Sequence, residues 1–564
     1  MKKIFLLMLA IGLGFSFAQS NQCDSNYTPT YELQGSERRS PFVGKIVSTK
    51  GVVTAVYPGK ESLGGFFVQD LNGDGDTATS DGVFVRITKR SDYVDMDINI
   101  GDLVFVTGKM LERNELSQID RLEALEICGQ AEVKASELSL PLSSLSELEQ
   151  YEGMRVKINQ ELSVAETYNL ARYGQVLLSL GRLYQPNNGQ TKADNALIQI
   201  LLDDTSNIEN PETVPYLNDD DYLRLGSTIS GIEGVIVNGG LGKYRLEPIQ
   251  VDSVKFTNSN PRTAKPDSYA HEISISSFNV LNYFTDLNER GADSPEEFER
   301  QTDKLLAALS SIDADVFGLI EIENDGNKTI AALTKSLNEY LGAEVYAYVP
   351  KPPLGLGTDQ IRQAIMYKPA KLKLITYGSE RKAIYNRPPV FASFKSVTDG
   401  EVFTVIVSHF KSKGGCPPGG DTDKGNGCWN LRRSAQAQTL SDFAAKISER
   451  INDTDVLLIG DLNSYRLETP IQVLESNNYT NIDIMLPLED RYSYVFKGEL
   501  GTLDYALVSE SLLPQVSGFD VWHINSDEAR MLDYNTEYNP AYLYQTSPYR
   551  SSDHDPAIIY LNLE

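Results

Sequence analysis

A polar, proline-containing segment at residues 257–267 (TNSNPRTAKPD) divides the chain into two stretches with different hydrophobic patterns. Such a composition is typical of a linker. Before it, short runs of β-branched and aromatic residues recur at close spacing, for example GVVTAV at 51–56 and GFFVQ at 65–69. Closely spaced strands separated by turns predict small all-β barrels or sandwiches. We place two such domains before the linker, at residues 19–135 and 136–256.

After the linker, apolar strands alternate with helices, which indicates an α/β domain over residues 268–564. Residues 273–278 and 315–320 have the apolar, β-branched composition of buried strands. Between them, Ser294-Pro295-Glu296-Glu297 predicts a helix start. Ser294 would be the N-cap, proline would occupy the first turn, and Glu297 would complete a capping box.

Polar side chains follow the predicted strands of this C-terminal stretch. They are Asn279, Glu321, Glu323, His409, Asp461, Asn463, Asp504, Asp553 and His554. Carboxylate and amide oxygens suit a hard cation such as Mg²⁺, and an Asp beside a His suits general acid–base chemistry. The chain has 4 His, so a site that needs three or more imidazoles is nearly excluded.

In this order, the motifs resemble the endonuclease/exonuclease/phosphatase superfamily over about residues 270–562. GDLN at 460–463 and SDHDP at 552–556 carry most of the resemblance. It implies a four-layered α/β sandwich (DNase-I-like) as catalytic domain. It also implies a metal-dependent phosphodiesterase in which water attacks a phosphodiester in line.

The resemblance implies that Glu321 binds the metal, Mg²⁺ or Mn²⁺, with Asn279 and Asp553 close to it. Glu323 lies two residues after Glu321. On an extended strand both side chains would face one side, so the pattern leaves open which glutamate binds the metal.

The remaining residues receive catalytic roles from the same resemblance. Asp461 and Asn463 would orient the attacking water and bind the phosphate. His554 would be the catalytic histidine, oriented by Asp504. His409 would contact the scissile phosphate or assist protonation of the leaving group.

Further segments are similar to ExeM-like secreted bacterial nucleases. They are FFVQD at 66–70, GDGD at 73–76, IEIENDG at 320–326, HFKSKG at 409–414 and CWN at 428–430. This resemblance implies all-β OB-fold-like domains ahead of the catalytic domain, and an extracellular DNase. It is least specific over residues 136–256, whose role the sequence leaves open.

The acidic loop that begins at Asp70 mimics the spacing of a calcium-binding loop. Its candidate ligands are Asp70, Asn72, Asp74, Asp76 and Asp81. The loop departs from the EF-hand pattern, because Asp replaces Glu at the twelfth position and β-type runs flank it. A Ca²⁺ site and a metal-free acidic hairpin loop are both compatible with this pattern.

A local basic and aromatic cluster bears on the substrate. It comprises Lys411, Lys413, Trp429, Arg432 and Arg433. Such residues suit contact with a phosphate backbone and base stacking. The formal net charge of −27 argues against broad electrostatic adhesion to nucleic acid, so local basic residues would have to supply the contact. Scattered surface charge is the alternative.

The N-terminus has the pattern of a signal peptide over residues 1–18. Lys2 and Lys3 precede an apolar run at residues 4–17, and a small residue at Ala18 ends it. The run is too short to span a bilayer, so we expect no transmembrane segment.

Export to an oxidising compartment favours disulfides. The four cysteines allow three pairings. Cys416 and Cys428 bracket a loop without apolar residues that a bond between them would order. Cys23 and Cys128 remain as the second pair.

These observations predict a secreted, metal-dependent DNase with little sequence specificity, a monomer without a stable protein partner. Its location after export (extracellular, periplasmic or on the cell surface), its choice of DNA or RNA and its endo- or exonuclease mode stay open. The alternatives are a sphingomyelinase or an inositol-phosphate phosphatase on the same fold, or a non-enzymatic binding or adhesion protein.

Overall fold

The computed structural model describes residues 22–191, 193–239, 243–353 and 355–563. The predicted signal peptide lies outside the described residues. Over the described part of the chain, no helix has the length and apolar character needed to cross a membrane.

The chain divides into two compact units. Unit 1 comprises Met1–Ser136, Leu148–Val156 and Val235–Lys243, and unit 2 comprises Glu137–Glu147, Lys157–Gly234 and Tyr244–Glu564. Unit 2 therefore contains most of the second β-rich segment together with the C-terminal α/β part. The sequence-derived boundaries at residues 135 and 256 stay predictions.

Unit 1 contains a closed five-stranded barrel with the strand order β1-β2-β3-β5-β4. Its elements are α1 (Thr30–Gln34), β1 (Ile46–Tyr57), β2 (Gly65–Gln69), β3 (Gly82–Arg86), β4 (Asp102–Arg113) and β5 (Leu116–Gln130). Val53, Val68 and Ile119 belong to its buried apolar core. The predicted pairing of Cys23 with Cys128 is confirmed, and it links the N-terminal arm to β5.

The second β-rich segment forms a six-stranded sheet with the order β11-β12-β10-β8-β7-β6. Its elements are β6 (Ser136–Glu137), β7 (Arg155–Glu166), α2 (Leu170–Tyr173), β8 (Val176–Ser179), β10 (Gln199–Leu202), β11 (Thr228–Asn238) and β12 (Tyr244–Pro248). A separate small sheet pairs β9 (Leu183–Tyr184) from this segment with a hairpin of the C-terminal part, β22 (Tyr494–Phe496) and β23 (Glu499–Gly501).

The C-terminal part contains two six-stranded sheets. In order across the first sheet, the strands are β15 (Ala347–Tyr348), β16 (Ile361–Tyr367), β14 (Val316–Glu323), β13 (Ile273–Tyr283), β26 (Ala557–Leu561) and β25 (Val516–Val521). In order across the second sheet, they are β17 (Leu372–Ser379), β18 (Val390–Ser396), β19 (Val402–His409), β20 (Val456–Asp461), β24 (Asp504–Ser509) and β21 (Tyr479–Asn481).

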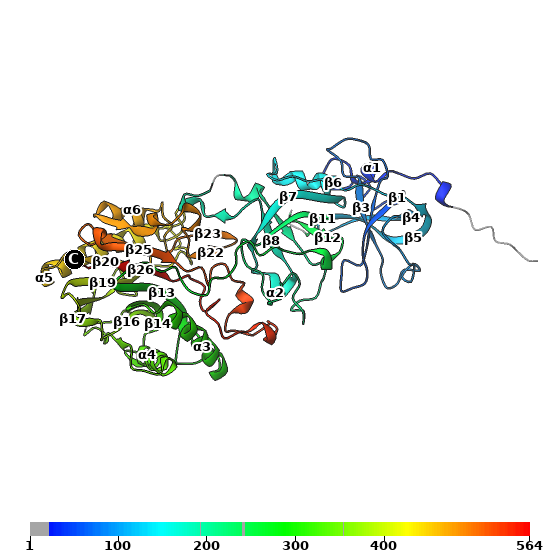
Figure 1. Ribbon diagram of the computed structural model, residues 1–564. Helices are drawn as coiled ribbons and strands as arrows, with labels where there is room; N and C mark the ends of the chain where they lie inside the picture. Colours follow the sequence, from blue (N-terminus) through cyan, green and yellow to red (C-terminus); the bar gives the residue numbers. More distant parts are fainter. Residues whose placement is uncertain (1–21, 192, 240–242, 354, 564) are drawn as a thin grey trace, which may run out of the picture. The chain divides into compact units, whose positions relative to one another are not determined.

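These sheets are stacked between two helical layers, as the C-terminal part in Figure 1 shows. Helices α3 (Pro295–Ile312) and α4 (Lys328–Leu341) pack on the first sheet, and α5 (Asn430–Ile451) and α6 (Thr469–Ser476) pack on the second. The predicted four-layered α/β sandwich is the observed arrangement.

The alternation of side chains along β14 explains the layering. Val316 and Ile320 point into the core between the sheets, whereas Phe317 and Leu319 contact the helices. Because strand side chains alternate between faces, an entirely apolar strand is stable only when both faces are covered. A Cβ on Gly318 would lie 2.5 Å from Ile459 Cδ1, so the two sheets pack closely there.

Helix α3 begins as predicted. The Ser294 side chain accepts a hydrogen bond from Glu297 N at 3.2 Å, and Pro295 occupies the first turn. The Glu297 carboxylate accepts from Asp293 N at 2.8 Å, one residue before the predicted partner. These two side-chain hydrogen bonds satisfy the backbone N–H groups of Glu297 and Asp293 at the helix start.

A buried ion-pair cluster joins the second β-rich segment to the C-terminal part within unit 2. Asp527 is fully buried and pairs with Arg182 and, at 3.4 Å, with Arg224. Arg224 Nη1 also lies 2.7 Å from Glu528 Oε1, and Arg262 of the predicted linker donates to the same carboxylate at 2.6 Å. The segment 257–267 is thus held at the junction through Arg262.

Candidate functional site

Strand register brings three predicted site residues side by side at the end of the second sheet. In the parallel pair β19–β20, His409 lies opposite Asp461. In the antiparallel pair β20–β24, Asp461 lies opposite Asp504. Asp461 is therefore flanked by the histidine on one side and the second aspartate on the other.

Gly460 lets the backbone approach closely before Asp461. Its φ is +135°, and a Cβ there would lie 1.9 Å from Ser408 O. No L side chain fits at that distance, so the glycine of GDLN keeps β19 and β20 in register. After it, Asn463 has φ 47° and its backbone N donates to Asp461 Oδ1 at 2.9 Å.

The first sheet supplies Asn279 and Glu321. Glu321 has φ 71°, and the pairing of β14 with its neighbours shifts register there. This left-handed conformation is uncommon for a glutamate and persists only where the surrounding structure holds it. Asn282 N donates to Glu321 Oε2 at 3.1 Å, and Asn279 Nδ2 lies 3.5 Å from Asp461 Oδ2.

The loop before β26 supplies Asp553 and His554. Ser552 Oγ donates to Asn279 O at 2.6 Å, which attaches this loop to β13. His554 Nδ1 lies 2.7 Å from Asp504 Oδ2, and Asp504 also accepts from Ser493 Oγ at 2.8 Å. The aspartate thereby fixes one edge of the imidazole and leaves Nε2 facing the site.

The other short distances converge on Asp461. Its Oδ2 lies 3.4 Å from His409 Nε2 and 4.0 Å from His554 Nε2. His409 Nε2 is also 3.9 Å from Glu321 Oε1. Two histidines and two carboxylates thus share one small volume between the sheet ends.

Burial and neighbouring charges together set the protonation of these groups. Burial raises the pKa of the Asp461 carboxyl to about 7, although the nearby His554 lowers it. Burial also lowers the pKa of His409 well below its usual range, and the cation Arg387 adds to this. For His554, burial lowers the pKa, but Asp504, Asp553 and Asp461 outweigh it and raise the value well above the usual range. His409 is therefore neutral at pH 7, and His554 is an imidazolium.

These groups lie in a cleft with a cavity volume of about 1210 Å³. Glu321, His409, Asp461, Asp553 and His554 are among its lining residues. The second β-rich segment contributes to the same lining between residues 185 and 199. A cleft of this volume is large enough for more than a single small phosphate ester.

Residues 276–554 match the Endonuclease/Exonuclease/phosphatase family. This part of the chain is an endonuclease/exonuclease/phosphatase domain. Members of the family are usually phosphoesterase hydrolases that use divalent metal ions such as Mg²⁺. A search of curated protein sequences finds no match to the chain.

Solved structures also align with this domain. A mannosyl-6-phosphatase of Bacteroides thetaiotaomicron is 15% identical, with a TM-score of 0.36 over 52% of this chain and 100% of its own. The human Nocturnin catalytic domain with bound sulfate is 17% identical, with a TM-score of 0.35 over 53% of this chain and 98% of its own. D. rerio TDP2 complexed with a single-strand DNA product is 15% identical, with a TM-score of 0.35 over 51% of this chain and 98% of its own.

The donor set of the endonuclease/exonuclease/phosphatase domain fits a magnesium ion. Among the described residues, no group of three or more His, Cys, Asp and Glu is arranged to hold a metal. Mg²⁺, however, usually binds one or two carboxylates and completes its coordination with water and substrate phosphate. Glu321 and Asp553 both line the cleft, and burial together with the charge of Asp553 raises the pKa of Glu321. A divalent cation held by Glu321, Asp553 and Asn279 would offset the repulsion between the two carboxylates that contributes to this shift.

Glu323 has a different environment from Glu321. Its Oε2 accepts hydrogen bonds from Thr285 N at 2.8 Å, Thr329 Oγ1 at 2.9 Å and Asp286 N at 3.2 Å. On a regular extended strand the two glutamates would face the same side. The positive φ of Glu321 interrupts that regularity, so the two side chains have different environments. Of the two, Glu321 lines the cleft and is the candidate metal ligand.

We expect Glu321→Gln to weaken Mg²⁺ binding at least tenfold, because it removes one of the two carboxylates of the candidate metal site. Isothermal titration with Mg²⁺ or Mn²⁺ measures this without relying on activity. Glu323→Gln is the matched control, and we expect it to change thermal stability and leave metal affinity unchanged. A metal affinity that falls in Glu323→Gln and not in Glu321→Gln would reverse the assignment.

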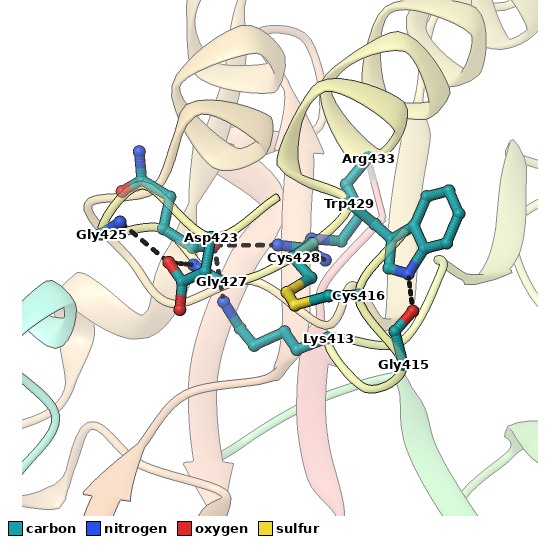
Figure 2. The surroundings of a disulfide bond; sticks show 10 residues. Lys413, Gly415, Cys416, Asp423, Gly425, Gly427, Cys428, Trp429 and Arg433 are labelled. Carbon is teal, nitrogen blue, oxygen red and sulfur yellow. Dashed lines mark hydrogen bonds between the residues drawn. A yellow bond between two sulfur atoms is a disulfide. The ribbon is translucent and has the colours of Figure 1, made fainter. Parts of the chain in front are cut away.

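The disulfide loop borders the cleft, and its predicted pairing of Cys416 with Cys428 is confirmed. Figure 2 shows the bond and the hydrogen bonds around it. Asp423 Oδ1 accepts from Gly425 N at 2.8 Å and from Gly427 N at 3.0 Å. Backbone and disulfide contacts thus order a segment that has almost no apolar side chains.

Three members of the predicted basic cluster lie together. Lys411 Nζ is 5.3 Å from the Trp429 ring centroid, and Arg432 Cζ is 5.9 Å from it. Trp429 Nε1 donates to Gly415 O at 2.8 Å, which orients the ring (Figure 2). These residues remain candidates for substrate contact.

The other two members, Lys413 and Arg433, have internal partners, as does Arg432, which donates to Ile384 O at 3.0 Å. Arg433 is fully buried and donates to Cys428 O at 2.6 Å and to Asn426 O at 3.0 Å. Lys413 Nζ bonds the Glu468 carboxylate and, at 3.2 Å, Asn426 O. Arg433 therefore supports the disulfide loop in this fold, and we leave it out of the proposed substrate contact.

The predicted calcium ligands lie in unit 1, in the loop between β2 and β3. Asp70 Oδ1 accepts from Asn72 N at 3.0 Å, and Asp74 Oδ1 accepts from Asp76 N at 2.8 Å. Burial, together with the charges of Asp74 and Asp70, raises the pKa of Asp81 to about 6. Such bonds also hold an ordinary hairpin loop, so a Ca²⁺ site stays a prediction.

Sequence reasoning missed two residues beside the candidate catalytic groups. The Tyr494 ring centroid lies 4.6 Å from that of His554. Arg387 is buried, lines the cleft and interacts electrostatically with Glu321 and Asp461. Neither residue belongs to one of the motifs at strand ends. Tyr494 lies in the β22–β23 hairpin, which directly precedes the strand that carries Asp504, so its place in the sequence could have pointed to a contact with the site.

Proposed function

We propose that the chain is a secreted, metal-dependent nuclease that hydrolyses phosphodiester bonds of DNA with little sequence specificity. The observation that carries the proposal is the His554–Asp504 pair facing Asp461, with Glu321 in the same cleft. A protonated histidine, a carboxyl that titrates near neutral pH and a metal-binding carboxylate are the groups that phosphodiester hydrolysis requires.

In the proposed mechanism, Asp461 accepts the proton of the attacking water, since its pKa of about 7 suits a general base at neutral pH. Asn463 helps to orient that water. His554 places its positive charge and its Nε2–H toward the phosphate, and Asp504 holds the ring in that orientation. A Mg²⁺ held by Glu321, Asn279 and Asp553 would neutralise charge that develops on oxygen.

His409 and Arg387 add to this mechanism from the other side of Asp461. His409 is neutral, so its Nε2–H can donate a hydrogen bond to a phosphate oxygen or to the leaving oxygen, whereas the His554 imidazolium can supply the proton that the leaving oxygen takes up. The Arg387 guanidinium donates to Phe410 O, which fixes it close to His409. A buried cation at this place favours an anionic substrate.

The rest of the chain supports a secreted enzyme on DNA. A closed five-stranded barrel with the order β1-β2-β3-β5-β4 is compatible with an OB-fold-like domain, a fold that binds oligonucleotides. Two disulfides suit an oxidising compartment, in line with the predicted signal peptide. A sphingomyelinase and an inositol-phosphate phosphatase remain the alternatives on the same catalytic groups.

A substrate panel separates these functions. Purified mature chain is incubated with Mg²⁺ and, in turn, with single-stranded DNA, duplex DNA, RNA, sphingomyelin and inositol phosphates. We expect cleavage of DNA at least tenfold faster than turnover of the lipid and the inositol phosphates. Faster turnover of either small substrate would replace the nuclease proposal, and no turnover of any substrate would favour a binding protein.

A further inference from the structure

A short hairpin carries an exposed aromatic side chain into the cleft. β22 and β23 are joined by Lys497 and Gly498, whose φ angles of 53° and 80° are those of a tight two-residue turn. Phe496 lies directly before the turn, is 51% exposed and lines the cleft. An aromatic ring in a polar cleft leaves a flat apolar face that a ligand can cover.

The strand fixes the position of Phe496 relative to the catalytic histidine. Tyr494, two residues earlier, packs its ring on His554. Side chains two residues apart on a strand share a face and are separated by about 6.8 Å. Tyr494 and Phe496 both line the cleft, whereas Val495 between them packs on a buried cluster with Leu500. Phe496 therefore lies on the cleft side of the strand, two residues beyond the Tyr494 that packs on His554.

The second β-rich segment holds the hairpin in place. β23 pairs in parallel with β9, and Gln185 N donates to Leu500 O at 2.8 Å. Asn195 Nδ2 donates to Glu499 Oε1 at 2.6 Å. A Cβ on Gly498 would lie 3.0 Å from Leu177 Cδ2, so the turn packs against β8. Because the hairpin already holds the ring in place, little conformational entropy is lost there when a ligand binds.

Charge around the ring selects the ligand. Lys497 Nζ lies 5.4 Å from the Phe496 ring centroid, and Arg290 lines the same cleft. A flat ring with one lysine beside it, in the same cleft as the groups proposed to bind a phosphate, matches a strand of alternating phosphates and bases. A sugar phosphate or an inositol phosphate has no flat aromatic face to cover the ring.

We propose that Phe496 is a stacking subsite for a nucleobase adjacent to the scissile phosphate, held in place by the second β-rich segment. This rests on the proposed nuclease function and narrows its substrate. A base inside a duplex is covered on both faces by its neighbours. The subsite therefore takes a base from a single strand or a frayed end, and the enzyme prefers such substrates to intact duplex.

Binding to an inactive background tests the subsite. Fluorescence anisotropy measures the affinity of His554→Ala protein, and of the same protein with Phe496→Ala, for a single-stranded oligonucleotide and for its abasic counterpart. We expect Phe496→Ala to weaken binding of the base-bearing strand by about tenfold or more and to leave the abasic strand unaffected. Phe496→Trp should retain the affinity, and Tyr340→Ala, an exposed aromatic on α4, is the matched control.

The outcomes separate the subsite from the proposed function. If active protein cleaves DNA but Phe496→Ala binds both strands like its parent, the subsite is wrong and the nuclease function stands. If the base-bearing strand depends on Phe496 while no phosphodiester is cleaved with any metal, the nuclease function is wrong and the subsite stands. An equal loss for both strands would also overturn the subsite, because it would indicate a general effect on the cleft.

Discussion

Replacing His554 with alanine is expected to lower the rate of phosphodiester hydrolysis by about 10²–10⁴-fold, the usual contribution of a positioned acid or base. The ring lies 2.7 Å from Asp504 and faces Asp461 at 4.0 Å. Three aspartates keep the imidazole protonated against the effect of burial. Alanine removes the charge and the Nε2–H donor together. The rate constant kcat on a labelled oligonucleotide, at saturating Mg²⁺, measures the loss.

A second histidine provides the control for that variant. His271 packs on the ring of Tyr560 at a centroid distance of 4.8 Å and lies outside the cleft lining. We expect His271→Ala to retain the kcat of the unchanged chain. Asp504→Asn should reduce kcat as well, because it removes the charge that orients the ring. A His554→Ala protein with unchanged kcat would show that another group does this work.

Replacing Asp527 with alanine is expected to lower the free energy of unfolding by about 3–5 kcal/mol, the usual cost of breaking a buried ion pair. Burial by itself raises the pKa of Asp527, but Arg182 and Arg224 outweigh it and hold the pKa well below its usual range. Alanine would remove the carboxylate that Arg182 and buried Arg224 share, and would leave Arg224 with Glu528 alone. Urea unfolding followed by circular dichroism measures the change.

The control for Asp527 is an exposed aspartate of the same unit. Asp220→Ala, in an exposed loop, should change the free energy of unfolding by no more than about 0.5 kcal/mol. Because the pKa of Asp527 is depressed, its stabilisation is fully present above the unfolded value of about 3.9 and declines as the pH falls toward the folded value. An unchanged urea midpoint in Asp527→Ala would contradict the role of the cluster.

Much of the site could be predicted from sequence, because its residues stand at strand ends. GDLN and SDHDP each follow or precede a strand, and sheet register then brings Asp461 beside His409 and opposite Asp504. The helix start at Ser294 and both disulfides depend on local patterns or on elimination among four cysteines, so they too were predictable.

Other features depend on contacts between residues far apart in the chain. The pairing of β9 with β23 joins residues about three hundred positions apart, and no local pattern signals it. Arg433 has the sequence context of a substrate-binding cation, yet its guanidinium is enclosed by the disulfide loop. The positive φ of Glu321, which separates its environment from that of Glu323, is likewise invisible in an otherwise regular strand.

Cleavage of supercoiled plasmid by the mature chain tests the central claim most directly. The unchanged chain and His554→Ala are incubated with plasmid in Mg²⁺, in Mn²⁺ and in EDTA, and products are separated on a gel. We expect nicked and linear DNA from the unchanged chain with either metal, and intact plasmid in EDTA and with His554→Ala. Plasmid left intact by the unchanged chain with both metals, or cleaved equally by His554→Ala, would contradict the account.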